Sequence, residues 1–91
     1  MKTTFIFTSQ LAAAAGCDKI CFESEAGETL LKITRALAKN YKAKVNDILF
    51  SDDKFSPTIM VVVNGNQVLD KNDVLLNEDS EVMFITPMAG G

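Results

Sequence analysis

Residues 58–63, Thr-Ile-Met-Val-Val-Val, are the strongest secondary-structure signal in this chain. The run is rich in β-branched residues and apolar at odd and even positions alike, which indicates a central strand covered on one side by a helix. Asn64-Gly65 follows at once and is the strongest short signal for a hairpin turn, so residues 67–69 are expected to return as its second arm. The chain is therefore expected to form a sheet with at least one helix packed on it.

Three other segments have strand character. Residues 2–8 and 19–24 are separated by a short connector, so we expect these two strands to pair antiparallel. Residues 81–86 form the last strand. Side chains alternate along it, so one face carries Val82 and Phe84 and the other carries Met83 and Ile85.

Helical periodicity dominates the middle of the chain. Thr29 is a good N-cap, and the residues behind it recur at the spacing of one helix face: Leu30, Ile33, Leu37 and Tyr41. A shorter helix over residues 10–15 is expected between Ser9 as its cap and Gly16 as its stop. Residues 45–49 indicate one more helical turn.

The remaining segments are expected to be connections. Residues 51–57 are predicted to form a polar loop, and residues 70–77 a polar connection whose Val74-Leu75-Leu76 packs under the sheet. This order of elements is the β-grasp layout. We predict an α+β fold, a mixed sheet of about five strands with one main helix across it. It forms one domain over residues 1–86, with a flexible C-terminal Gly-Gly tail over residues 87–91.

Composition excludes several kinds of chemistry. Nine basic and 12 acidic residues give a net charge of -3, and the lysines form no run, which disfavours nucleic-acid binding. The chain has no histidine, which removes the usual general base and the commonest metal ligand. Neither a membrane span of ~20 apolar residues nor a convincing export signal is found. We expect a cytoplasmic protein that binds no metal, nucleic acid or membrane.

Cys17 and Cys21 are the only cysteines. They could pair or supply half of a thiolate metal site, but a structural zinc site needs four ligands and no second cluster exists. Two reduced cytosolic thiols are the favoured interpretation, and neither residue is assigned a function.

The chain ends in Gly90-Gly91, where glycine neither stops a helix nor makes a turn. Two terminal glycines arise by chance in roughly one sequence in two hundred. Residues without Cβ can thread a channel too narrow for side chains, so the Gly91 carboxylate becomes a group that can be delivered to a partner. Pro87 cannot donate to a β-ladder, and we expect strand pairing to stop near it.

An apolar strip is expected to lead from the sheet to this terminus. Met83 and Ile85 lie on the outer face if Val82 and Phe84 face the helix, and Met88 continues toward the end. Contiguous exposed apolar surface of this kind usually marks a partner site. The alternative, that residues 70–76 or a loop cover the strip, is left open by the sequence.

Five segments carry a resemblance to a known family: Leu11-Ala-Ala-Ala-Ala-Gly16, Gly27-Glu-Thr-Leu-Leu31, Val61-Val-Val-Asn-Gly65, Leu76-Asn-Glu-Asp-Ser-Glu-Val82 and Ile85-Thr-Pro-Met-Ala-Gly-Gly91. Together they resemble the small subunit of molybdopterin synthase and its relatives, the MoaD/ThiS ubiquitin-like sulfur carriers. Two positions depart from the family pattern. Asp79 stands where a glycine is frequent in the turn before the last strand, and Thr86-Pro87 stands where the molybdopterin members commonly have two prolines.

The resemblance implies a mechanism carried by the terminus. An ATP-dependent adenylating enzyme of the ubiquitin-activating type activates the Gly91 carboxylate, and a sulfur donor converts the acyl-adenylate into a thiocarboxylate. The tail then enters the large subunit of molybdopterin synthase and gives its sulfur to a pterin precursor. Gly90 and Gly91 would carry the chemistry, and docking would use Met83, Ile85, Pro87 and Met88. The chain itself would bind no cofactor and be a non-catalytic small subunit.

Three alternatives accompany this interpretation. A thiamin-pathway carrier shares the terminus, although those proteins tend to be shorter and the extra residues 42–57 favour the molybdopterin type. A ubiquitin-like protein modifier would join Gly91 to lysines of other proteins by the same activation chemistry. A plain β-grasp interaction domain would leave the tail without a role, because fold alone does not determine function.

Overall fold

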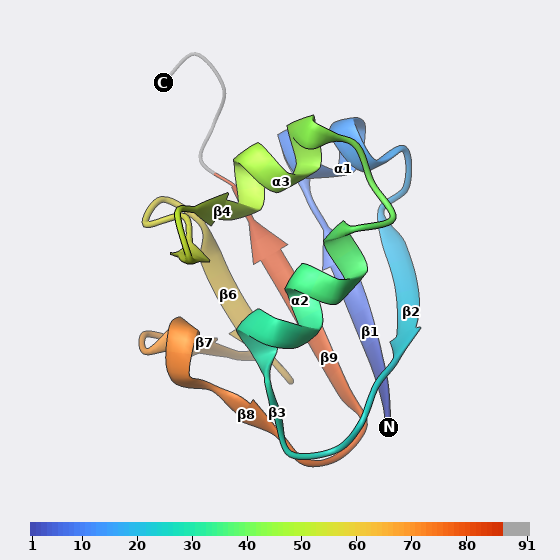
Figure 1. Cartoon of the computed structure of the whole chain (residues 1–91), viewed down its shortest axis with the longest axis vertical. Coiled ribbons are helices and arrows are strands. Elements are labelled where there is room, and N and C mark those ends of the chain that lie inside the picture. The colour runs from blue at the N-terminus through green and yellow to red at the C-terminus, as the bar shows by residue number, and fades with distance from the viewer. Residues whose placement is uncertain (87–91) are drawn as a thin grey trace.

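The computed structural model describes residues 1–86, and a five-stranded mixed sheet forms its centre. The strands are β1 (Lys2–Phe7), β2 (Lys19–Glu23), β6 (Met60–Val63), β7 (Asn66–Val68) and β9 (Ser80–Ile85). They lie in the order β2-β1-β9-β6-β7, so the last strand occupies the middle of the sheet (Figure 1). Strands β1 and β9 run parallel and the other pairs antiparallel. This arrangement confirms the predicted α+β, β-grasp fold.

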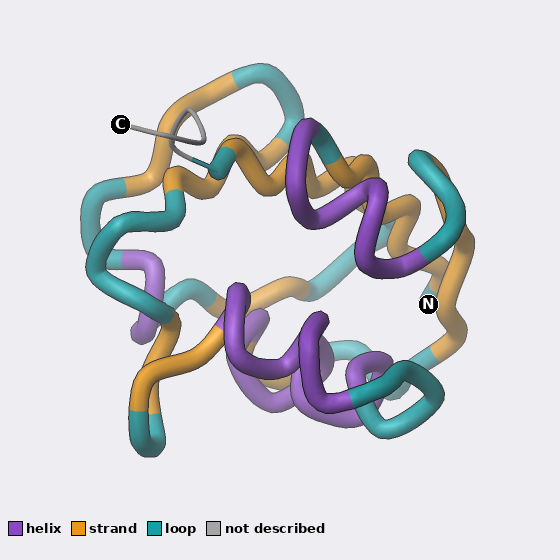
Figure 2. Tube along the Cα trace, turned by 90° about the horizontal axis from the view of Figure 1, so that it is seen from above, coloured by secondary structure: helices purple, strands orange, loops and turns teal. Residues whose placement is uncertain are grey.

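Helices α1 (Ser9–Ala15), α2 (Leu30–Ala38) and α3 (Ala43–Leu49) accompany the sheet, with a 3-10 turn, η1 (Lys71–Asp73), before the last strand. Seen from above in Figure 2, α2 and α3 lie along one side of the sheet. The Thr29 side chain accepts a hydrogen bond from the Lys32 N–H at 3.2 Å, which confirms it as the N-cap of α2. Over residues 1–86 no helix is long and apolar enough to cross a bilayer.

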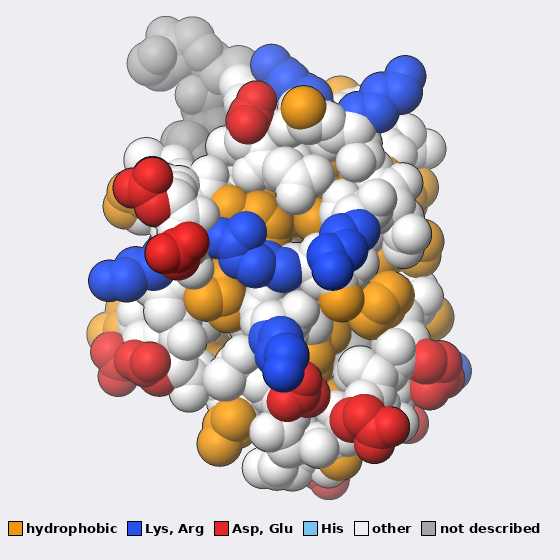
Figure 3. All heavy atoms as spheres, viewed as in Figure 1, with side chains coloured by type: hydrophobic (Ala, Val, Ile, Leu, Met, Phe, Trp, Pro, Cys, Tyr) orange, Lys and Arg blue, Asp and Glu red, His pale blue; other side chains and the backbone are white. Residues whose placement is uncertain are grey.

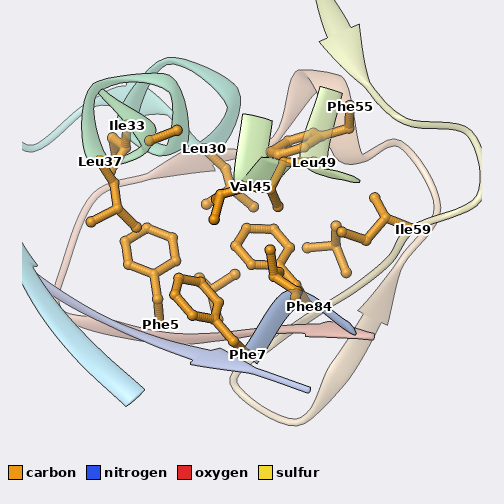
Figure 4. Packing of buried hydrophobic residues seen from close by; sticks show 14 of the residues in the cluster. Phe5, Phe7, Leu30, Ile33, Leu37, Val45, Leu49, Phe55, Ile59 and Phe84 are labelled. Atoms are coloured by element: carbon orange, nitrogen blue, oxygen red, sulfur yellow. The ribbon is translucent and has the colours of Figure 1, made fainter. Parts of the chain in front are cut away.

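The core lies between the sheet and the helices and is built around phenylalanine rings. The Phe84 ring centroid lies 5.8 Å from that of Phe5 and 6.3 Å from that of Phe7. Phe5 and Phe7 are successive inward-facing residues of β1. Figure 4 shows these rings facing the aliphatic side chains of α2 and α3, which are Leu30, Ile33, Leu37, Val45 and Leu49. Each such side chain contributes about 1.5–3 kcal/mol when fully buried, so this layer supplies most of the driving force for folding.

Two short strand pairs complete the fold. β4 (Phe50–Ser51) pairs with β5 (Lys54–Phe55), and β3 (Glu28–Thr29) pairs with β8 (Leu75–Leu76). The prediction of a polar loop over residues 51–57 was wrong for Phe55. Its side chain is buried, and its ring stacks 5.8 Å from that of Phe50. Only the turn between the two strands is polar, and the aromatic residue that follows it returns to the core.

The predicted apolar plug at residues 74–76 is correct for one leucine and wrong for the other. Leu76 is buried, whereas Leu75 is 57% exposed. Consecutive residues of a strand point to opposite faces, so only one of the two can reach the core.

Tyr41 was predicted to lie on the inner face of the long helix, but α2 ends at Ala38. Its ring nevertheless packs edge-on against that of Phe7, with the ring centroids 6.2 Å apart.

The start of α1 differs from the prediction as well. Thr8, not Ser9, is the N-cap residue, and Thr8 makes no side-chain hydrogen bond to the helix. Ser9 has a φ of 50°, in the left-handed region that costs non-glycine residues energy. The chain therefore reverses sharply from β1 into α1.

Asp79, one of the two departures from the family pattern, is accommodated without strain. Among described residues other than glycine, positive φ angles occur only at Ser9, Asp52 and Asn64. The turn before β9 thus does not require a glycine here. The Asp79 carboxylate instead accepts a hydrogen bond from the Lys2 N–H at 2.7 Å, which fixes the start of β9 against the start of β1.

Candidate functional site

The face of the sheet opposite the helices presents a row of apolar side chains on its three middle strands. We call the outer sheet face the set Ile6, Met60, Val62, Met83 and Ile85. Met83 pairs with Ile6 on one side and Val62 on the other, and Ile85 pairs with Met60. Because alternate residues of each strand face inward, Val82 and Phe84 are fully buried while Met83 and Ile85 point outward, as the sequence predicted.

The outer sheet face is accessible in the described part of the chain. Met60 is 42% exposed, and the other four side chains are half-buried. The alternative that residues 70–76 cover this face is wrong. That segment packs against α2 through η1 and pairs with β3 through β8, on the helix side of the sheet. Apolar surface of this kind is suited to contact with another protein.

The tail root, which we define as residues 84–86, is the end of β9 and the point from which the tail continues. The Thr8 hydroxyl donates a hydrogen bond to the Phe84 carbonyl at 2.9 Å. The Thr86 hydroxyl, which is nearly buried, points back at the Thr8 carbonyl at a longer distance of 3.5 Å. The last backbone pair between β1 and β9 is Phe7 with Phe84, so the two hydroxyls extend the pairing beyond the ladder.

The predicted site residues therefore divide into two groups. Met83 and Ile85 lie together on the outer sheet face, and Ile85 also belongs to the tail root. Pro87, Met88, Gly90 and Gly91 lie outside the described residues, as does the predicted tail over residues 87–91. The sequence did not predict the role of Thr8, which was assigned only to the end of the first strand.

The titratable side chains of residues 1–86 were compared for clusters and for shifted pKa values. No group of three or more Cys, Asp or Glu side chains that could hold a metal ion is found among them. Burial lowers the pKa of Lys71, but its ammonium group donates to the Ser56 carbonyl at 2.7 Å and the Ile59 carbonyl at 2.6 Å. Both bonds hold the loop before β6, so this lysine is structural.

A second surface feature lies between the C-terminal half of α1 and the connection from α2 to α3. It is an open hollow of about 610 Å³ whose lining includes Ala13, Lys39, Tyr41 and Lys42. On the α1 side it is lined by the small residues Ala13, Ala14, Ala15 and Gly16. Figure 3 shows the lysine and arginine side chains spread over the helix-bearing face without gathering into one patch, which agrees with their scatter along the sequence.

The fold and the site together define a class of protein. A five-stranded mixed sheet with its last strand in the centre and helices on one face is the ubiquitin-like β-grasp fold. The sequence matches the ThiS family over residues 6–91, and the chain belongs to that family, the ubiquitin-like sulfur carriers of the ThiS/MoaD type. No curated protein sequence matches the chain.

Several solved structures have the same fold over nearly the whole chain. The small archaeal modifier protein SAMP1 from Haloferax volcanii has a TM-score of 0.85 at 20% identity, with 100% of both chains covered. A putative molybdopterin converting factor, subunit 1, from Pyrococcus furiosus has a TM-score of 0.75 at 19% identity, covering 97% of this chain and 99% of that one. The BexX/CysO complex of Amycolatopsis orientalis contains a chain with a TM-score of 0.74 at 21% identity, covering 98% and 99%.

Proposed function

We propose that this protein is the small subunit of a molybdopterin synthase, and that its sulfur travels as a thiocarboxylate on Gly91. The observation that carries the proposal is the match to a family of sulfur carriers, which runs through Gly90-Gly91. The similarity to a molybdopterin converting factor subunit supports the choice of pathway. The protein would work in the cytoplasm with three partners: an adenylating enzyme, a sulfur donor and the synthase large subunit.

The chemistry begins at a poor electrophile, because a carboxylate has no leaving group. One oxygen of the Gly91 carboxylate attacks the α-phosphate of ATP and pyrophosphate leaves, which gives an acyl-adenylate. Sulfur at the oxidation level of sulfide then attacks the carbonyl carbon and displaces AMP, which leaves a thiocarboxylate. The domain contributes no acid or base to these steps, so its own part is to bind the partner and present the tail.

The outer sheet face is the proposed docking surface for these partners. Met83 and Ile85 belong to the strand that continues into the tail, so a partner that binds this face is next to the tail root. Pro87 and Met88 would extend the contact along the tail. Binding energy gained at the sheet would then hold the terminus in the partner's active site, which is how remote contacts raise the rate at a reacting group.

The intact mass of the protein tests the proposal. After incubation with ATP, sulfide and the adenylating enzyme of the same organism, we expect a gain equal to the replacement of one oxygen atom by sulfur. A variant that lacks Gly91 is the control and should gain nothing. An unchanged mass, with an enzyme that a separate assay shows to be active, would contradict the proposal. Incubation of the sulfurated protein with the synthase large subunit and pterin precursor then tests the pathway, because only a molybdopterin carrier would yield the dithiolene product.

A second candidate function is protein modification. The specific observation in its favour is the full-length similarity to SAMP1, which is named as a small archaeal modifier. Both functions use an activated Gly91, but a modifier joins it to a lysine amine through an amide bond. Conjugates that survive on a denaturing gel and disappear in the variant without Gly91 would favour this function. A thiamin-pathway carrier is distinguished by transfer of its sulfur to a thiazole precursor instead of a pterin.

A further inference from the structure

We propose that Thr8 and Thr86 are positioning residues, which fix the end of β9 against β1 so that the tail leaves the domain from one defined point. The inference rests on the proposed function, because it concerns how the Gly91 carboxylate reaches a partner's active site. Neither hydroxyl touches the reacting atoms. Their effect would come through the tail root alone.

The first support is the contact between Thr8 and Phe84. Backbone pairing of the two parallel strands ends at Phe7 with Phe84, and the Thr8 hydroxyl reaches the Phe84 carbonyl at 2.9 Å, an ordinary hydrogen-bond distance. The Thr8 carbonyl accepts the Leu11 and Ala12 N–H groups of α1 at 3.1 and 3.3 Å. Thr8 thus joins β1, α1 and the end of β9 at a single residue.

The second support is the unusual use of this hydroxyl. A threonine at the N-cap normally accepts a hydrogen bond from the first turn of its helix, but Thr8 makes no such bond. The neighbouring Ser9 is held at a φ of 50°, a conformation that side chains rarely adopt. The Thr8 hydroxyl is therefore not used as a helix cap, and Ser9 is strained. The Thr8 hydroxyl instead donates a hydrogen bond to the Phe84 carbonyl of β9.

The third support is Thr86, the residue that directly follows β9. Its side chain is 6% exposed, and its hydroxyl is 3.5 Å from the Thr8 carbonyl. The two threonine hydroxyls thus reach across the same junction from opposite sides, from Thr8 to Phe84 and from Thr86 to Thr8.

The physical consequence concerns how often the terminus finds its target. Once the outer sheet face is docked, delivery of the Gly91 carboxylate is intramolecular, and its effective concentration at the partner's active site depends on the point from which the chain leaves the domain. A displacement of about 1 Å at a reacting group can lower a reaction rate by up to ~100-fold. Loss of the threonine contacts should therefore lower the turnover of the docked complex more than the affinity of docking.

The experiment compares Thr8→Val with the wild-type protein as the substrate of the adenylating enzyme, with thiocarboxylate formation followed by mass. Valine keeps the shape of threonine and removes the hydroxyl. We expect kcat to fall by about tenfold with little change in KM, because the outer sheet face is intact. Thr8→Ser restores a hydroxyl and should recover most of the lost kcat.

Thr34→Val is the matched control. The Thr34 hydroxyl donates to the Leu30 carbonyl at 2.7 Å inside α2, so the variant loses a similar bond away from the tail root. We expect its kcat to match that of the wild type. An equal fall in Thr34→Val, a serine variant no better than Thr8→Val, or an unchanged kcat in Thr8→Val would each overturn the inference.

Two further comparisons separate a folding defect and a failure of the proposed function from a loss of positioning. Where Thr8→Val does not fold, Thr86→Val is measured instead, and an unchanged kcat there overturns the inference equally. Failure of the proposed function has a different signature, because the wild-type protein itself would then gain no sulfur. If the wild-type protein gains sulfur and all the threonine variants have the same kcat as the wild type, the positioning role is refuted and the proposed function is not.

Discussion

The hydroxyl oxygen of Tyr41 lies 3.6 Å from the Sγ of Cys17, within hydrogen-bond distance for a sulfur partner. The contact joins the connection after α2 to the segment after α1. Burial of the phenol and this contact with Cys17 together raise the pKa of Tyr41 to about 12, from its ordinary 10.0. Both cysteines are free thiols. The contact with Tyr41 gives Cys17 a structural role that the sequence did not indicate.

Tyr41 is the only tyrosine and the chain has no tryptophan, so its titration can be followed directly by phenolate absorbance. We expect a midpoint near pH 12 in the folded protein. In Cys17→Ala the midpoint should move toward 10 but not reach it, because burial is the larger cause. The unfolded chain ionises first, so the stability contributed by neutral Tyr41 is complete below pH 10 and is lost as pH rises to 12. A wild-type midpoint at 10 would contradict the burial of the phenol, and an unchanged midpoint in Cys17→Ala would contradict the contact.

Substitution on the outer sheet face should weaken partner binding without unfolding the domain. We expect Met83→Asp to reduce affinity for the adenylating enzyme by about 2 kcal/mol, roughly thirtyfold, since a charge would replace a half-buried apolar side chain at the proposed interface. Calorimetric titration measures this, and thermal unfolding checks the fold. Leu69→Asp is the control, because Leu69 is 85% exposed and not part of that face. Equal losses in both variants would argue against this docking surface.

Lys71→Met should destabilise the domain by about 1–3 kcal/mol through the loss of two charge-assisted hydrogen bonds. Its ammonium group donates to the Ser56 and Ile59 carbonyls, which would be left without this partner. Urea unfolding measures the change. Lys54→Met serves as the comparison, because Lys54 is exposed and its side chain makes no hydrogen bond or ion pair with residues 1–86. A result within error of the wild type would show that solvent replaces both bonds without cost.

Neighbouring residues of β9 should respond very differently to truncation. Phe84→Ala is expected to cost about 3–5 kcal/mol, because the ring is fully buried among Phe5, Phe7 and Phe55. Ile85→Ala should cost less than about half of that, since Ile85 is half-buried on the outer sheet face. Denaturant titration of the two variants compares them directly, and similar costs would mean that the outer face is covered in solution.

The elements with strong local signals were predicted well. The apolar run at residues 58–63 and the Asn64-Gly65 turn gave a hairpin, and Gly65 has the positive φ that such a turn requires. Thr29 caps α2 as expected. These predictions succeeded because a hairpin turn and a helix cap are each determined by residues that are close together in the sequence.

The errors arose where distant residues decide the outcome. Phe55 sits in a polar stretch, and only its ring contacts, stacked on Phe50 and tilted against Phe84, show that it belongs to the core. Thr8 was predicted only as the end of the first strand, with no role for its hydroxyl, whose partner is 76 positions away along the chain. No local pattern reports a carbonyl that distant, so the tail root could not be derived from sequence, whereas the outward direction of Met83 and Ile85 could.

The order of the strands also determines at what stage of translation the domain can fold. β9 is the last described strand to be synthesised, and it is the one that joins β1 to β6. Until it leaves the ribosome, the two halves of the sheet have no common neighbour and the Phe5 and Phe7 rings lack Phe84. Contacts of such long sequence separation form late and slowly. Folding of the domain must therefore follow translation of β9, so a nascent or prematurely terminated chain has neither the docking surface nor a terminus to activate.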